Sequence, residues 1–165
     1  MMMRVLHEGG MEIIADEDSL EPRKNNAFGI YEIKEYSGFE WLIDNPGKLA
    51  GRAVKIVTQY ANIIESLAVK KVPMRLIFMS RSISAILKSL KNADMIWDPP
   101  PRESIALGRK IISYYKIPTM FVHYEEALKF PTGTCLRVKD WVGKNLDVDK
   151  MIAAIDPTQN HHPEV

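Results

Sequence analysis

The chain has 165 residues, of which 46% are hydrophobic and 26% are charged, and its formal net charge is +1. This length and composition are ordinary for one globular domain that buries a core. A charge so close to zero argues against a general nucleic-acid-binding surface, which is normally distinctly basic.

Cysteine usage and hydropathy narrow the class of protein further. Cys135 is the single cysteine, so no internal disulfide can form and a reducing compartment is expected. Its expected role is that of a small packed side chain, since no motif around it suggests a nucleophile. No apolar run approaches the roughly 18–20 residues that span a bilayer. We therefore expect a cytoplasmic protein with neither membrane nor nucleic acid as a partner.

The first sixteen residues, MMMRVLHEGGMEIIAD, predict a helix followed by a short strand at 11–15. Gly9–Gly10 suits the end of that helix. Three apolar residues have the spacing of its buried face: Met2, Met3 and Leu6. Residues 16–28 are charged and loop-like, and a helical turn is predicted at 39–43.

The rest of the chain alternates between strand and helix patterns. Strands are predicted at 53–58, 75–79 and 119–124. Helices are predicted at 60–67, at 83–90, in a segment that runs to about Lys116, and at 125–130, 135–144 and 148–155. Four residues have the spacing of a buried face in the second of these helices: Ile83, Ile86, Leu87 and Leu90.

This alternation predicts an α/β fold: a three-layer parallel sheet with helices on both faces. We expect a single domain over residues 1–157, followed by a flexible tail at 158–165. The tail contains His161–His162, which has no partner at metal-ligand spacing, and no zinc, haem or iron–sulfur pattern occurs. The expectation is therefore no metal.

A candidate anion site follows the strand at 75–79, within the stretch RLIFMSRSISAILKSL. Ligands of parallel sheets bind beyond the carboxyl ends of the strands. Arg81 lies at that end, Ser82 or Ser84 could cap the next helix, and Ser89 adds a hydroxyl two turns on. The alternative is that Arg81 pairs with a surface carboxylate and that Ser89 is a solvated helical serine.

Arg81 followed eight residues later by Ser89, after the strand LIFMS, resembles the 3′-phosphate-binding segment of bacterial-type sulfotransferases. Those enzymes use 3′-phosphoadenosine 5′-phosphosulfate (PAPS). Further stretches match the family in order: MMMRVLHEGGMEIIAD, NNAFGIYEIKE with Ala27 in place of the usual proline, GRAVKIVTQY, VHYEEAL and WVGKNLDVDKMIAAIDPTQN. The resemblance implies a P-loop nucleotide-binding fold with PAPS as co-substrate and Arg81 and Ser89 as cofactor-binding residues.

In that family a central strand and a phosphate loop precede the first helix, and the loop holds the 5′-phosphosulfate. This sequence begins where the loop would end, and neither Gly9–Gly10 nor PTGTC at 131–135 has the strand–loop–helix setting of such a loop. Positioning and charge stabilisation dominate the related phosphoryl transfer. We therefore expect a truncated chain that is a poor catalyst as written.

An acceptor hydroxyl or amine would need a general base in the full-length form. Glu32, in GIYEIKE, is the first candidate because that segment borders the acceptor pocket in the family. The alternative is a solvated glutamate near Lys34. His7, in the first helix, is a weaker candidate, and His123 lies within a strand, where a satisfied core histidine is the alternative.

Three hypotheses remain open. The first is a sulfotransferase-like domain that acts on a small-molecule or carbohydrate acceptor, with homo-oligomerisation favoured if a sheet slot is exposed. The second is a non-catalytic nucleotide-binding or regulatory protein that keeps the half-site of Arg81 and Ser89. The third is a small-molecule kinase-like transferase, which usually needs a Walker-type lysine and a magnesium-binding aspartate that are not evident here.

Overall fold

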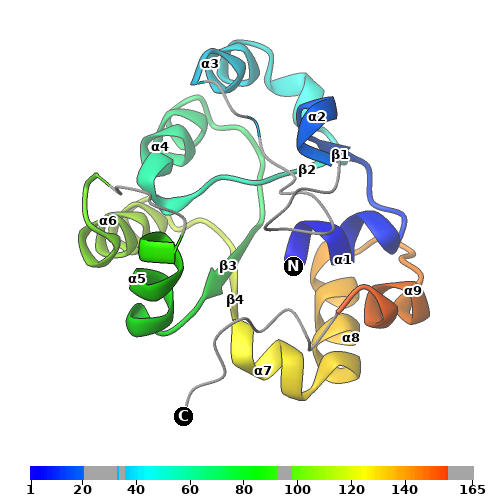
Figure 1. Ribbon diagram of the computed structural model, residues 1–165. Helices are drawn as coiled ribbons and strands as arrows, with labels where there is room; N and C mark the ends of the chain where they lie inside the picture. Colours follow the sequence, from blue (N-terminus) through cyan, green and yellow to red (C-terminus); the bar gives the residue numbers. More distant parts are fainter. Residues whose placement is uncertain (21–32, 34–35, 93–97, 156–165) are drawn as a thin grey trace. The chain divides into compact units, whose positions relative to one another are not determined.

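The computed structural model describes residues 1–20, 33, 36–92 and 98–155 (Figure 1). Contacts between residues divide this part of the chain into two compact units. The first comprises residues 1–56 and 135–155, and the second comprises residues 57–134. The expectation of a single domain over 1–157 stays a prediction, and the tail at 158–165 lies outside the described residues.

The first unit is mainly helical and contains one short parallel strand pair. β1 (Ile13–Ile14) and β2 (Ala53–Val54) pair with Ile13 opposite Ala53. The helical elements are α1 (Met2–Glu8), α2 (Glu17–Leu20), α3 (Tyr36–Asp44), the 3₁₀ turn η1 (Pro46–Leu49), most of α8 (Pro131–Val142), and α9 (Val148–Ala153).

The predicted first helix is confirmed, and its packing explains the glycine that ends it. Met2, Met3, Val5 and Leu6 of α1 are all buried. Gly9 lies against α9, where a Cβ atom added to it would be 2.5 Å from Cγ of Met151. The backbone N–H of Asp147 also donates to the carbonyl of Gly9 at 3.0 Å. Glycine therefore allows a close approach that any side chain would obstruct.

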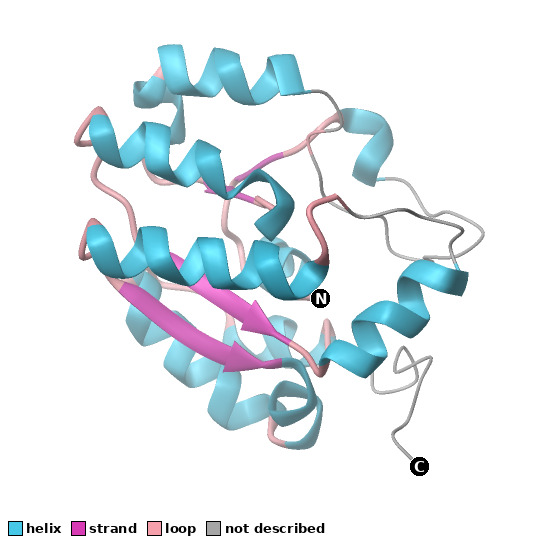
Figure 2. Ribbon diagram, turned by 90° about the vertical axis from the view of Figure 1, so that its left-hand side faces the viewer, coloured by secondary structure: helices cyan, strands magenta, loops and turns pink. Residues whose placement is uncertain are grey.

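The second unit is built around a longer parallel pair, β3 (Leu76–Ser80) and β4 (Thr119–His123). These are the two long arrows that lie side by side in Figure 2, and their register places Phe78 opposite Phe121. The helical elements of this unit are η2 (Thr58–Tyr60), α4 (Ala61–Val69), α5 (Ile83–Asn92), α6 (Pro101–Tyr114) and α7 (Tyr124–Lys129).

The core of the second unit lies where α4 and α6 meet the start of the strands. Ala61, Ile111 and Ile117 form a buried cluster. Five partly buried side chains pack against this cluster: Ile64, Ala68, Met74, Leu76 and Tyr115. Burying such apolar surface is the main favourable contribution to folding.

The α/β class and the parallel pairing are therefore confirmed, while several details differ from the predictions. Leu87 is 51% exposed instead of facing inward, and Ala85 is the buried residue of α5, because packing partners rather than spacing decide which face is covered. The strand predicted at 53–58 has ladder bonds only at Ala53–Val54, since β1 offers two residues for pairing. Within the segment expected to be a loop, Glu17–Leu20 forms one helical turn, and α8 begins at Pro131.

Candidate functional site

The connection from β3 to α5 is organised by Ser82. Its Oγ accepts a hydrogen bond from the backbone N–H of Ala85 at 3.3 Å and lies 3.2 Å from Oγ of Ser84. Ser82 is therefore the residue that caps α5, which settles the choice between the two predicted capping serines. Arg81 is held between the last residue of the strand and this cap.

Arg81 is fixed by two consecutive residues at the start of α7. Its guanidinium carbon lies 4.6 Å from the centroid of the Tyr124 ring, which is a cation–π arrangement. Its Nε lies 3.8 Å from Oε1 of Glu125. A carboxylate at that distance, with 41% of its side chain exposed, contributes weakly to stability. The surface ion pair considered as the alternative for Arg81 is thus present, but it is long, and only its carboxylate is well exposed to solvent, since Nε of Arg81 is buried.

The carboxyl ends of β3 and β4 also bring Ser80 and His123 together. The two residues are directly opposite in the parallel register, and Ser80 Oγ lies 2.8 Å from His123 Nδ1. His123 is exposed at the end of its strand, so the core-histidine alternative is wrong. Sequence reasoning missed Ser80, because its contact with His123 is set by the register of the two strands, which the residue pattern within each strand does not fix.

Ser89 is exposed on α5, seven residues after Ser82. Seven residues are nearly two turns, so the two serines lie on the same face of the helix, about 10 Å apart along its axis. The structure thus places Arg81, Tyr124 and Glu125 in one cluster and leaves Ser89 further along the adjoining helix.

The other predicted site residues lie elsewhere. His7 is exposed on α1, in the unit that does not contain Arg81. Glu32 lies outside the described residues, as does His161–His162. Cys135 is fully buried in α8, and its burial raises the pKa of the thiol to about 11. This confirms the prediction that Cys135 is a packed side chain.

The comparisons with known proteins leave the family open. No family model, no curated protein and no solved structure matches the chain. Over the residues that the structure describes, no helix is both long and apolar enough to cross a bilayer. Any assignment of function therefore depends on the sequence patterns and on the geometry around Arg81.

Proposed function

We propose that this chain is a sulfotransferase-like domain that uses PAPS as co-substrate, with Arg81 and Ser89 contacting the 3′-phosphate. The observation that carries the proposal is the position of Arg81, directly after a parallel strand and before the capped start of α5, with its guanidinium stacked on Tyr124. This is the end of a parallel sheet at which ligands bind.

The chemistry of these groups suits a phosphate. The guanidinium group offers paired N–H donors that match phosphate oxygens, and stacking on Tyr124 limits the orientations it can take. The first backbone N–H groups of α5 and its dipole favour an anion at the same place. Ser89, on the same helix face as Ser82, supplies a hydroxyl further along α5.

The proposal extends to the fold and to the reaction. For the fold we propose the three-layer, P-loop-like architecture that the sequence resemblance implies, and the parallel pairing within each unit is the structural feature that fits it. In the proposed reaction, an acceptor oxygen or nitrogen attacks the sulfur of PAPS, the bond from sulfur to the bridging phosphate oxygen breaks, and 3′,5′-adenosine bisphosphate leaves. The acceptor proton passes to a base, for which Glu32 is the proposed residue and His7 the weaker alternative; no metal is invoked.

The test is calorimetric titration of the full chain with 3′,5′-adenosine bisphosphate, which probes the Arg81 half-site directly. We expect binding at least about tenfold tighter than that of adenosine 5′-monophosphate, because only the bisphosphate places charge on Arg81. Arg81→Ala should weaken it at least about tenfold, and Ser89→Ala about threefold to tenfold. The matched control is Arg75→Ala, which removes an arginine from the opposite end of β3 and should leave the affinity unchanged.

Each other outcome has a defined meaning. Equal affinity for the two nucleotides, or an Arg81→Ala variant that binds like the parent chain, contradicts the proposal. Tight, Arg81-dependent binding without transfer of labelled sulfate from PAPS supports the non-catalytic alternative. Preference for a magnesium–nucleoside triphosphate over the bisphosphate would instead support the kinase-like alternative.

A further inference from the structure

The two connections that lead into β3 and β4 share one sequence pattern and one backbone shape. Lys71-Val72-Pro73 joins α4 to β3, and Lys116-Ile117-Pro118 joins α6 to β4. Each lysine has a positive φ, 56° for Lys71 and 51° for Lys116. The residue after each lysine donates its backbone N–H to the carbonyl five residues earlier, at 3.0 Å in both cases. These bonds show that α4 and α6 end in the same way, each with a lysine in the left-handed conformation that stops the helix.

Glycine adopts this left-handed conformation without the steric cost that a lysine meets. Both connections therefore carry lysine where glycine would fold at lower cost. A lysine near a helix C-terminus also interacts favourably with the helix dipole, so strain alone does not define a site. The two lysines share a second feature, because both line the same cavity.

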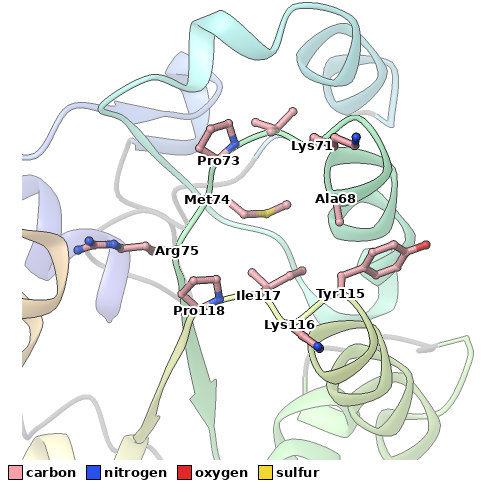
Figure 3. A pocket seen from close by; sticks show the side chains of 10 residues that line it. Ala68, Lys71, Pro73, Met74, Arg75, Tyr115, Lys116, Ile117 and Pro118 are labelled. Atoms are coloured by element: carbon pink, nitrogen blue, oxygen red, sulfur yellow. The ribbon is translucent and has the colours of Figure 1, made fainter.

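That cavity has a volume of about 550 Å³ and is lined by residues of the two connections and of the adjoining helix ends. This size lies within the range of small-molecule sites. Figure 3 shows Met74 and Ile117 extending from the strand side toward Ala68, and all three belong to the apolar cluster of the second unit. The floor of the cavity is therefore apolar.

The rim is basic. Lys71 and Lys116 are both exposed and lie on opposite sides of this floor in Figure 3, while Arg75 extends the other way. Among the described residues that line the cavity, none is acidic. The neighbouring carboxylate of Glu65 accepts a hydrogen bond from the Tyr115 hydroxyl at 3.3 Å. An anion that enters the cavity therefore meets two ammonium groups and no lining carboxylate.

We propose that this cavity binds an amphipathic organic anion, with its apolar body against Met74, Ile117 and Ala68 and its carboxylate or sulfate group at the rim, where Lys71 and Lys116 supply positive charge. The site is distinct from the Arg81 cluster, since the five residues of β3 put about 16 Å between the two ends of the strand. It does not depend on the proposed transferase function.

The test uses decanoate as the probe and the full chain labelled with ¹³C at its methionine methyl groups. The Met74 resonance is assigned by its loss in Met74→Leu. We expect saturable shifts of this resonance with decanoate, much weaker ones with 1-decanol, which lacks the charge, and none with acetate, which lacks the apolar body. Repeating the titration with decyl sulfate separates carboxylate from sulfate ligands.

Two double variants decide the role of the lysines. Lys71→Gly/Lys116→Gly keeps the backbone shape and should weaken decanoate binding at least about tenfold, because both charged partners are removed. The matched control Lys88→Ala/Lys110→Ala makes the same change in net charge on α5 and α6 and should bind like the parent chain. Lys71→Met/Lys116→Met provides the same test if the glycine variant does not fold.

The proposal is overturned if decanol binds as tightly as decanoate, if the Lys71 and Lys116 variants bind within about twofold of the parent chain, or if the Met74 resonance does not move. Excess 3′,5′-adenosine bisphosphate should leave decanoate binding unchanged. Failure of the nucleotide titration would therefore not affect the proposal for this cavity, and failure of the decanoate titration would not affect the proposal for Arg81.

Discussion

Arg81 and Tyr124 meet because each is the first residue after one of two paired strands. The register places Ser80 opposite His123, so the next residue on each chain segment lies at the same edge, and the guanidinium carbon comes to 4.6 Å from the tyrosine ring centroid. Glu125 follows Tyr124 and reaches Nε of Arg81 at 3.8 Å. A bound phosphate would therefore share the arginine with this carboxylate.

Glu125→Gln should strengthen the binding of 3′,5′-adenosine bisphosphate. Removing the carboxylate takes away a negative charge that competes with the phosphate for Arg81. At low ionic strength we expect the affinity for the bisphosphate to rise about threefold, since exposed ion pairs contribute about 1 kcal/mol or less. Calorimetry at low and high salt checks this prediction, and the gain should shrink as salt screens the charges. Weaker binding by the variant would show that Glu125 supports the site instead of competing for it.

Lys71→Gly and Lys116→Gly should each raise the free energy of unfolding by about 0.5–1 kcal/mol, because glycine removes the strain of a positive φ. Urea denaturation measures the change. Lys110→Gly is the control, because Lys110 lies within α6 and glycine there should lower the free energy of unfolding by about 0.5–1 kcal/mol. A loss of stability in Lys71→Gly or Lys116→Gly would mean that the native lysine gains more from the helix dipole and its contacts than it loses through strain.

Gly9→Ala should lower the free energy of unfolding by about 1–3 kcal/mol, as overpacking of a filled core does. The added Cβ would lie 2.5 Å from Cγ and 3.1 Å from Sδ of Met151, whose side chain is fully buried and has little room to move. Gly133→Ala, in α8, has open space around its Cβ and should not be destabilising. Thermal denaturation of the two variants side by side tests the contact, and equal midpoints would contradict it.

Cys135 should be protected from thiol reagents in the folded protein. Its side chain has an exposed fraction of 0%, and burial raises its pKa to about 11. At pH 8, Ellman's reagent should react only after denaturant is added, because the thiolate is the reactive form. Rapid reaction without denaturant would show that α8 opens readily.

The same thiol makes stability depend on pH in the alkaline range. Above an unfolded-state pKa of about 9 the unfolded chain loses the thiol proton, while the folded chain holds it until about pH 11. The unfolded state then binds fewer protons, so the free energy of unfolding falls as pH rises through this interval. Cys135→Ala should remove that contribution, and the difference between the two urea-denaturation series isolates it from other groups that titrate there.

Local patterns predicted much of this molecule because they depend on neighbours along the chain. Apolar spacing located α1 and α4, and the dense apolar run located β3 with Arg81 at its end. Leu87 shows the limit of such reasoning, since its spacing suited a buried face and yet half of its side chain is exposed. The cavity carried a signal in the repeated lysine–branched residue–proline pattern, which was not recognised in the sequence.

The sequence by itself therefore determined the alternation of helices and strands, the placement of Arg81 after a strand and the burial of Cys135. Only the tertiary structure decided that Arg81 stacks on Tyr124, that Ser80 meets His123, and that Lys71 and Lys116 line one cavity. The physical reason is that secondary structure follows from periodicities a few residues long. Contacts between residues more than forty positions apart are set by the strand register, which depends on how β3, β4 and their helices pack.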